Sequence, residues 1–549
     1  MKKKVITLFA LFCTMIGGRT MACTDLLVGK NASVDGSVMI SYAADSHGLY
    51  GEMYRWPAAK WPKGTLLDVY DWDSGKFLGQ IPQVAETYSV VGNMNEHQLA
   101  ITESTFGGRR ELVDSTGLID YGSLIYITLQ RAKTAREAIR IMTDLVATHG
   151  YYSGGESFSI ADKHEVWIME MIGKGVGNKG AVWVAIRIPD DCISAHANQS
   201  RIQQIPFDDK ENCMYSPDVV SFARKKGYFN GKDQDFSFAK AYNPYDFGGL
   251  RGCEARVWSF FRKYDPTMDQ YTDFIKGDPT KEPMPLYIKP NRKLSVRDVQ
   301  HAMRDHYEGT DLDMTKDAGA GPYKVPYRWR PMHFKVDGQE YLNERAIATQ
   351  QTAFVIVSQM RNWLPDPVGG ILWFGVDDAD MTLFNPVYCC ALEAPVCYRV
   401  GNGDLYNFSW TSAFWIHNWV ANMAYHKYSF MIQDIRVVQD EIEGGYTKNL
   451  PLIEEKAVEL YNKNPQEAVY FLTQFSGMNA DQATTRWKQL GEYLIVKYID
   501  GNVKKEEYGR FKRNPYGLPA SPDFPGYDEE YYRSIVNSAG DRLKVKEIK

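Results

Sequence analysis

The sequence lacks several features that identify common classes of protein. No two cysteines have the two-residue spacing of zinc sites, so a zinc site is not expected. There is no basic stripe, and 68 acidic residues outnumber 63 Lys and Arg, which argues against a nucleic acid partner. No internal repeat or low-complexity tract is present, and no apolar run beyond position 22 is long enough to span a membrane.

The first 22 residues have the pattern of a secretory signal peptide. Lysines at positions 2–4 precede an apolar core over 5–16, and Gly17 and Gly18 then interrupt it. Thr20 and Ala22 are the small residues that signal peptidase favours, with Met21 between them. We therefore expect cleavage after Ala22, export to the periplasm or the extracellular space, and a mature chain that is more acidic than the net charge of −5 of the whole sequence.

Cleavage at this position would make Cys23 the first residue of the mature chain. Its carbon would then carry both a thiol, which is a nucleophile, and an α-amine, whose reference pKa of roughly 7.7–8.0 lets it accept the thiol proton. Seven of the eight cysteines follow position 22. In an exported protein six of these could pair in disulfides, and Cys23 is then the cysteine expected to stay free.

Two other interpretations of Cys23 remain open. In a lipoprotein the thiol and the amine would both be acylated, which would disable them, but such proteins usually have an aliphatic residue three positions before the cysteine, where this chain has Thr20. Alternatively, Cys23 is an ordinary small buried residue, since free cysteine often behaves as a hydrophobic side chain.

The order of the predicted elements indicates an α+β fold built on antiparallel strands. Strand pairs are expected over 24–44 and 87–105, helices over 122–132 and 134–149, and further short strands up to 198. A strand-rich section follows at 346–400, after a helix over 252–263, another near 295–304 and a long loop over 306–331. The C-terminal part is predicted to be helical near 411–423, 451–463, 465–475 and 480–496.

Several motifs, in one order, resemble a known family. They are CTDLLVGKNASVDGS at 23–37, GNMNEHQLAITESTFGG at 92–108, ESFSIADKHEVWIMEM at 156–171 and SAHANQSRI at 194–202. Together they resemble the exported cysteine dipeptidases of the N-terminal nucleophile hydrolases, whose relatives include penicillin V acylase and choloylglycine hydrolase. The resemblance implies an αββα sandwich over 23–400, a mainly helical part over 401–549 packed on it, and no metal or organic cofactor.

The resemblance also implies roles for individual residues. Cys23 would attack the amide carbonyl with its own amine as the base, and Asp45 would hold that amine in position. Asn198 would contact the amine or the developing oxyanion. Arg256 would stabilise charge around Cys23, although Arg251 matches the same position of the pattern almost as well. The ordinary alternatives are that Asp45 is an acidic residue of a turn, Asn198 an asparagine of a loop and Arg256 an arginine on the surface of a helix.

Two positions depart from the pattern of the acylase relatives. Tyr42 stands where those relatives usually have an arginine, which makes the surroundings of the thiol less positive and puts acylase chemistry in doubt. Thr105 stands where an oxyanion-hole asparagine is usual, and its hydroxyl can donate a single hydrogen bond of shorter reach. Acids such as Asp25 and Asp45 would suit the ammonium group of a dipeptide, and we expect Asp25 to bind substrate.

Other polar residues are expected to be structural. His47, His97 and His196 are interpreted as structural histidines rather than as catalytic or metal groups. Three aspartates of the long loop resemble part of a calcium loop but lack its glycine and its terminal glutamate; they are Asp311, Asp313 and Asp317. A second cluster of acidic residues consists of Asp377, Asp378 and Asp380. We expect these residues to lie in an exposed loop, and binding of an ammonium group is the alternative.

Three functions were compared on this basis. The first is a cysteine dipeptidase, the second an acylase that cleaves a non-peptide amide, and the third a lipid-anchored protein that binds a peptide or glycan without cleaving it. A closed, charged pocket would favour the dipeptidase and an open, apolar one the acylase. The sequence does not determine which substrate side chains are preferred, how the cysteines pair or how many copies associate. A homo-oligomer is compatible with it.

Overall fold

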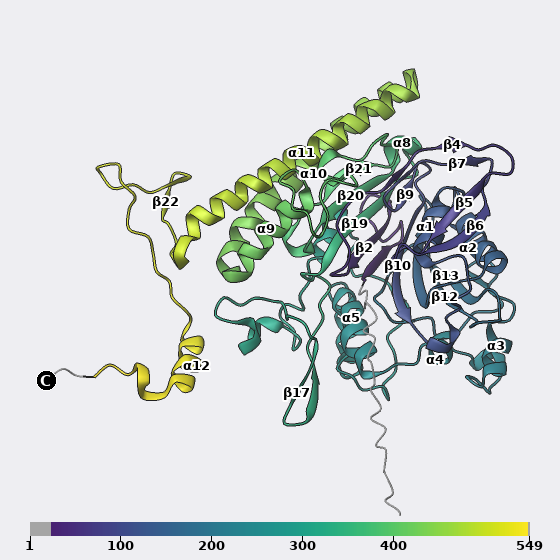
Figure 1. The fold of residues 1–549 in the computed structure, drawn as a ribbon, viewed down its shortest axis with the longest axis horizontal. Coiled ribbons are helices and arrows are strands. Elements are labelled where there is room, and N and C mark those ends of the chain that lie inside the picture. Colours follow the sequence, from purple (N-terminus) through teal and green to yellow (C-terminus); the bar gives the residue numbers. More distant parts are fainter. Residues whose placement is uncertain (1–22, 547–549) are drawn as a thin grey trace, which may run out of the picture.

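The computed structural model describes residues 23–546, so the predicted signal peptide lies outside the described residues. Two antiparallel sheets form the centre of the molecule (Figure 1). The first sheet contains, in spatial order, β16 (Tyr287–Ile288), β14 (Ile193–His196), β1 (Asp25–Val28), β2 (Val38–Asp45), β19 (Thr352–Met360), β20 (Ile371–Val376) and β21 (Asn385–Tyr388). The second contains β15 (Cys213–Tyr215), β13 (Ala181–Ile188), β12 (Val166–Gly173), β11 (Gly155–Ala161), β10 (Ala100–Gly107), β9 (Met94–Asn95), β8 (Val90–Val91) and β3 (Arg55–Trp56).

The sheets and helices form four layers. One hydrophobic core lies between the sheets and joins Leu27 and Ile40 of the first to Ile168 and Val184 of the second. Helices α1 (Tyr121–Leu129) and α2 (Ala135–His149) cover the outer face of the second sheet. Because both faces of each sheet are covered, strands such as β12 (VWIMEMIG) are buried at every residue instead of alternating.

The outer face of the first sheet is covered by helices that follow β14 in the chain. These are α5 (Ala255–Arg262), α7 (Val296–Ala302), α10 (Tyr428–Lys463) and α11 (Pro465–Tyr498). The predicted α+β class with antiparallel sheets and a helical C-terminal region is confirmed. The helical region shares its core with the first sheet, and the boundary near residue 400 stays a prediction.

Local sequence signals explain the early elements. The predicted hairpin of β1 and β2 forms, with Leu27 opposite Ile40. The hydroxyl of Thr134 accepts a hydrogen bond from the backbone N–H of Glu137 and so caps α2, while Gly150 ends that helix. In α1 the cap is Asp120, whose carboxylate accepts from two backbone N–H groups.

The C-terminal helices are longer than the sequence predicted. A helix was expected to begin at 451, but α10 runs from Tyr428 to Lys463 and contains Pro451. Two helices were expected over 465–496, but α11 is continuous. A proline inside a helix costs about 3 kcal/mol, yet burial of Leu450 and Ala457 on either side of Pro451 against the first sheet offsets this.

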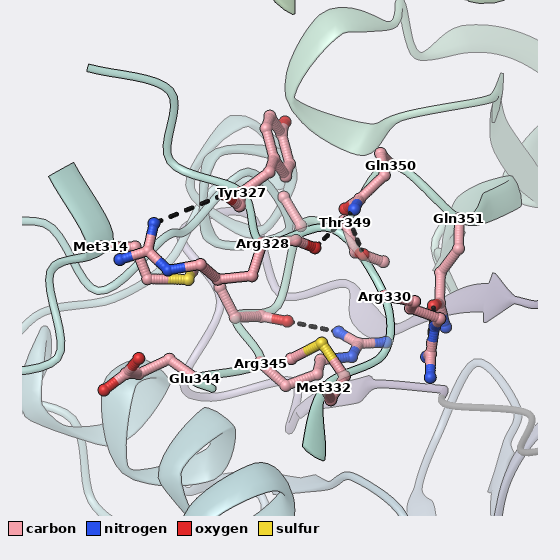
Figure 2. Close-up of a pocket in the computed structure, with 12 residues that line it drawn as sticks. Met314, Tyr327, Arg328, Arg330, Met332, Glu344, Arg345, Thr349, Gln350 and Gln351 are labelled. Carbon is pink, nitrogen blue, oxygen red and sulfur yellow. Dashed lines mark hydrogen bonds between the residues drawn. The ribbon is translucent and has the colours of Figure 1, made fainter. Parts of the chain in front are cut away.

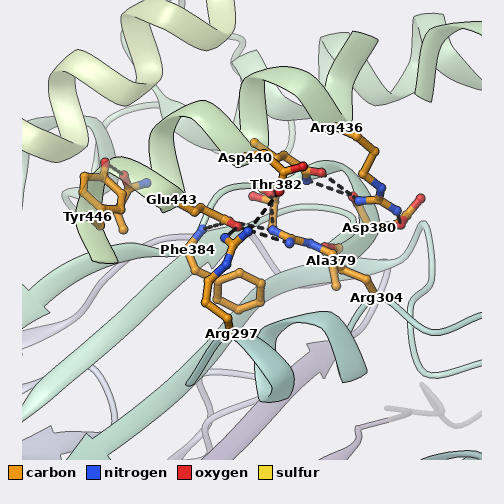
Figure 3. Close-up of polar contacts among 12 residues, drawn as sticks. Arg297, Arg304, Ala379, Asp380, Thr382, Phe384, Arg436, Asp440, Glu443 and Tyr446 are labelled. Carbon is orange, nitrogen blue, oxygen red and sulfur yellow. Dashed lines mark hydrogen bonds and ion pairs between the residues drawn. The ribbon is translucent and has the colours of Figure 1, made fainter. Parts of the chain in front are cut away.

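Buried ion pairs join Arg297 of α7, and Arg304 two residues beyond the end of that helix, to α10 (Figure 3). The carboxylate of Glu443 accepts from the Arg304 guanidinium at 2.6 Å and from the backbone N–H of Phe384 at 3.1 Å. It also pairs with the guanidinium of Arg297. Glu443 is 1% exposed, so this network lies inside the layer between α10 and the first sheet.

The expectation of an exposed acidic loop at 377–380 is wrong. Asp378 and Asp380 are fully buried, because α9 (Ala413–His426) and α10 lie over them. The hydroxyl of Tyr425 donates to Asp378 at 2.9 Å, and that of Tyr428 donates to Asp380 at 2.7 Å. Asp380 also pairs with Arg436 of α10 (Figure 3). These carboxylates are therefore bound to the protein itself.

Two further segments were not predicted. The hairpin of β17 (His333–Val336) and β18 (Gln339–Leu342) projects from the body (Figure 1). Beyond α11 the chain leaves the body as an extended arm with β22 (Glu506–Glu507), β23 (Arg510–Phe511) and α12 (Glu529–Ala539), and α12 has no buried residue. Over residues 23–546 no helix combines the length and apolarity that crossing a membrane requires, and all seven described cysteines are free thiols.

Candidate active site

The hairpin of β1 and β2 determines the surroundings of Cys23. Cys23 directly precedes β1, and Thr24 bridges to Ala43 of β2. This register puts Cys23 beside the end of β2, where Asp45 lies, and on the same side of the hairpin as Tyr42. Cys23 is fully buried between the two sheets.

Arg256 of α5 holds the backbone at Cys23. Its Nη1 donates to the carbonyl oxygen of Cys23 at 2.6 Å and to Oγ1 of Thr24 at 2.8 Å. Its Nη2 donates to Oδ1 of Asn198 at 2.9 Å. Arg251, the other candidate for this position, pairs instead with Glu344. The structure therefore brings Arg256, and not Arg251, to the candidate nucleophile.

Asn198 lies directly after β14 in the left-handed backbone region, with φ of 58°, which asparagine tolerates better than most residues. Its backbone N–H donates to Oγ of Ser104 at 3.1 Å, and its Nδ2 donates to the carbonyl oxygen of Thr105 at 2.8 Å. Together with the contact to Arg256, these bonds fix the Asn198 side chain between β10 and α5. Asn198 and Arg256 both line the cavity described below.

Asp45 is held from the far half of the chain. Oδ1 accepts from the Thr352 hydroxyl at 2.6 Å, and Oδ2 pairs with the guanidinium of Arg345. Thr352 lies opposite Asp45 in the pairing of β19 with β2. Burial raises the pKa of Asp45, although the charge of Arg345 acts in the opposite direction. Both oxygens of the Asp45 carboxylate are thus engaged by the protein.

Tyr42 and Glu103 lie beside the Cys23 thiol. The Tyr42 hydroxyl donates to Oε1 of Glu103 at 2.8 Å, and the thiol is 3.6 Å from the same oxygen and 3.7 Å from the hydroxyl. Burial raises the pKa of the Cys23 thiol well above its ordinary value, and the charge of Glu103 raises it further. The thiol is therefore protonated at neutral pH, so it needs a base when it attacks.

A second glutamate accompanies Glu103. In the pairing of β10 with β11, Thr105 lies opposite Glu156, which puts both on the same face as Glu103. Burial raises the pKa of Glu103 to about 7 and that of Glu156 well above its ordinary value. The Thr105 hydroxyl hydrogen-bonds to the Glu156 carboxyl and lowers its pKa. Thr105 thus faces the glutamates, and its carbonyl oxygen holds Asn198.

A cavity of about 850 Å³ opens next to these residues. Thr105, Asn198 and Arg256 are part of its wall. Charged residues of both signs also line it: Asp71, Asp73, Glu156, Asp246, Arg110, Arg330 and Arg345. A smaller hollow shares Arg330, Met332 and Arg345 with the cavity and is built by residues 314–351 (Figure 2). This segment therefore forms one side of the cavity.

Asp25 lies away from the cavity. It is fully buried on β1, its Oδ1 accepts from the Thr102 hydroxyl at 2.5 Å, and it is not among the residues that line the cavity. Direct contact with a substrate ammonium would need a carboxylate at the cavity wall, and the structure does not place Asp25 there. His196, which neighbours it, is held between the hydroxyls of Ser104 and Ser159 at 2.7 and 2.8 Å.

Sequence reasoning missed Glu103, Glu156, Arg345 and Thr352 as neighbours of the site. Glu103 and Glu156 carried one usable signal, because each is the only charged residue of its strand. Arg345 and Thr352 carried none, since their contact with Asp45 depends on which strand lies next to β2.

Comparison with known proteins identifies the family of this chain. The model of peptidase family C69 matches residues 22–55 and 49–441. A "Probable dipeptidase" of Latilactobacillus sakei is 28% identical over 82% of this chain and 90% of its own length. One of Salmonella dublin is 27% identical over 68% and 83%, and "Dipeptidase A" of Lactobacillus helveticus is 23% identical over 73% and 81%. The buried cysteine at the head of β1 thus lies within the matched region, and the chain belongs to peptidase family C69.

Proposed function

We propose that this protein is an exported cysteine dipeptidase whose mature chain begins at Cys23 and that hydrolyses short peptides through an acyl-thioester. The observation that carries the proposal is the surroundings of Cys23. Its carbonyl is held by Arg256, its thiol lies beside Tyr42 and Glu103, and a charged cavity adjoins these residues. The relatives named as dipeptidases support the choice of substrate.

The first half of the reaction would form the thioester. The α-amine of the mature Cys23 takes the thiol proton, and the sulfur bonds to the carbonyl carbon of the peptide while the carbonyl electrons move to its oxygen. When this tetrahedral species collapses, the C–N bond breaks and the departing amine takes the proton from the Cys23 ammonium. The C-terminal amino acid then leaves.

The second half would release the N-terminal amino acid. Water attacks the thioester carbonyl and gives a proton to the α-amine, and the C–S bond breaks as the carboxylate forms. The departing sulfur takes the proton back, which restores the thiol and the amine. Because burial raises the pKa of the Cys23 thiol, its attack needs a base, and we assign this role to the α-amine of Cys23.

Neighbouring residues would position these groups. Asp45, next to Cys23 and held by Arg345 and Thr352, would orient the α-amine. Asn198 would donate to the oxyanion from the wall of the cavity, together with backbone N–H groups. The Thr105 hydroxyl is bound to Glu156, so we assign Thr105 to positioning Asn198 through its carbonyl oxygen instead.

The lining of the cavity favours a peptide over a non-peptide amide. A dipeptide carries an ammonium and a carboxylate close to its scissile bond, and burying each of them is costly unless it is paired. Carboxylates and guanidiniums both line this cavity, whereas an acylase for an apolar group would need a mainly apolar pocket. This observation supports a dipeptidase rather than the acylase alternative.

The test compares the processed protein with nucleophile variants. Protein recovered after export is expected to begin at Cys23 by mass spectrometry and to hydrolyse dipeptides, and a chelator should leave the rate unchanged. Cys23→Ser should reduce kcat/KM by about 1,000-fold or more, because the hydroxyl is the poorer nucleophile. Its circular dichroism and melting temperature should match those of the wild type.

Two other thiols serve as controls. Cys192, buried and outside the cavity lining, should tolerate Cys192→Ala without loss of activity. Cys253 does line the cavity, so Cys253→Ala tests whether it is the nucleophile instead. Full activity of Cys23→Ser, an acylated Cys23, or a mature chain that begins elsewhere would each contradict the proposal.

A further inference from the structure

The chemistry of a dipeptide fixes where its ammonium group must lie. Attack requires the sulfur to be roughly 3–3.5 Å from the carbonyl carbon. Standard bond lengths put the α-nitrogen of the same residue about 2.5 Å from that carbon. The ammonium therefore lies within about 6 Å of the Cys23 sulfur, and in a buried site it needs a counter-charge at that distance.

Four buried carboxyl groups lie near the Cys23 thiol or next to a group that does: Asp25, Asp45, Glu103 and Glu156. Two of them are unsuitable as the site for the substrate ammonium. Asp45 is already assigned to the α-amine of Cys23 in the proposed function, and its two oxygens also bind Thr352 and Arg345. Asp25 is fully buried, bonded to Thr102 and absent from the cavity wall. The remaining two are Glu103 and Glu156.

Glu103 and Glu156, which contact each other, meet the two requirements between them: Glu103 lies at the thiol, and Glu156 reaches the cavity wall. Oε1 of Glu103 is 3.6 Å from the Cys23 sulfur, and Glu156 lines the cavity while being 1% exposed. Apart from the partner carboxyl, neither Oε2 atom has a hydrogen-bond partner within residues 23–546. A buried carboxylate oxygen without a donor is costly, and such a group facing a cavity indicates that a ligand supplies the donor.

The charge of the pair also matches one ammonium. Two carboxyl groups in contact inside a protein do not both ionise, because the second charge would lie against the first in a medium of low polarity. The pair therefore keeps one proton and carries at most one negative charge, which the positive charge of a bound ammonium would stabilise. Thr105 and Tyr42 each donate to one member, which fixes the orientation of both carboxyls.

We propose, on the basis of the proposed function, that the Glu103–Glu156 carboxyl pair binds the free α-ammonium of the N-terminal residue of the substrate. This arrangement limits cleavage to the first peptide bond, since a longer N-terminal extension would put an uncharged amide against the pair. The substrate class is therefore peptides with an unblocked first residue, and N-acylated peptides are excluded.

The test measures the preference for a free amine. Wild-type enzyme is assayed with a dipeptide and with the same dipeptide carrying an N-acetyl group, and it should prefer the free form by about 100-fold or more. Glu156→Gln should lower kcat/KM for the free dipeptide by about tenfold or more relative to kcat/KM for the acetylated one, so that the preference for a free amine falls. A merely structural role of Glu156 would lower both rates together.

The matched control is Glu165→Gln, a glutamate of the same sheet region that pairs with Arg136 and does not line the cavity. It should keep the wild-type preference. Glu103→Gln provides a second test should Glu156→Gln fold poorly, and it should reduce the preference in the same way. If folded variants of both glutamates keep the preference within about twofold, the ammonium site is disproved while the dipeptidase stands. If the wild type cleaves no dipeptide, the proposed function itself fails.

Discussion

At the scale of single residues, the site is a set of buried polar groups that satisfy one another. Cys23 is the residue on which the others converge, and its thiol lies among carboxyl groups that disfavour the thiolate. His196 shows the same principle a few ångströms away, since both ring nitrogens are bonded to serine hydroxyls of the opposite sheet. Burial lowers its pKa to about 3, so the ring stays neutral in the folded protein.

The neutral state of His196 predicts a pH dependence of stability. The unfolded chain binds a proton to this histidine below about pH 6.5, and the folded chain does not until about pH 3. The contribution of His196 to stability is therefore complete above pH 6.5 and falls by about 1.4 kcal/mol per pH unit below it. His196→Gln should be less stable than the wild type at pH 7.5, and the difference in melting temperature should shrink as the pH is lowered to 5.

The control for this measurement is His426→Gln, because His426 is exposed at the end of α9. Its melting temperature should follow that of the wild type over the whole pH range. Parallel curves for His196→Gln and the wild type would contradict the interpretation of His196 as a buried neutral ring.

The sequence indicated some of these residues and not others, for a physical reason. The positions of Cys23, Asn198 and Arg256 were suggested by motifs in their own segments. Tyr42 was noticed only as a departure, and Glu103 was not singled out at all. Tyr42 and Glu103 both lie at the thiol because β2 of the first sheet faces β10 of the second, and the two residues are about 60 positions apart in the chain. No local pattern of residues encodes this contact between the sheets.

At the scale of elements, the buried network of Glu443 attaches α10 to the rest of the fold (Figure 3). Glu443→Gln leaves Arg304 buried without its counter-charge, which typically costs about 3–5 kcal/mol. The melting temperature should therefore fall clearly. Glu441→Gln on the same helix removes only an exposed pair with Arg486 and should change stability by about 0.5 kcal/mol or less. Equal effects of the two substitutions would contradict the assigned role of Glu443.

The helices show where local rules were sufficient and where they were not. The cap at Thr134 and the apolar spacing that follows it predicted α2 almost to the residue. The same rules predicted breaks in the C-terminal helices at Pro451 and near Gly477. Both helices continue there because Leu450 and Ser476 are buried against the first sheet and its connections, and this tertiary packing outweighs the local preference.

At the scale of the whole molecule, the four layers account for most of the described chain, and the arm beyond α11 does not take part in them (Figure 1). The arm touches the body at two places. Beside α11, Phe511 stacks on Tyr493 and Glu506 pairs with Lys497. At the start of α12, Asp528 pairs with Lys324 at 3.0 Å and Tyr527 packs on Tyr323. Both members of this ion pair are largely exposed, so the pair contributes little to stability.

Removal of residues 502–549 should consequently leave the fold and the activity intact. The melting temperature of the shortened protein is expected to stay within about 5 °C of that of the full chain, and kcat/KM on a dipeptide within about threefold, because α12 has no buried residue. Calorimetry and a kinetic assay on the two purified proteins would measure this. Aggregation or loss of activity would mean that the arm is part of the catalytic body.

The pairing of Asp45 with Arg345 links residues 300 positions apart. During synthesis on the ribosome, Cys23 leaves the exit tunnel early, whereas Arg345 and Thr352 follow only after most of the chain. Under the proposed function, a nascent or truncated chain thus carries the nucleophile without the groups that orient it. The proposed reactive centre is completed only when Arg345 and Thr352 have been made, so an unfinished chain would lack the means to attack its own segments or its neighbours.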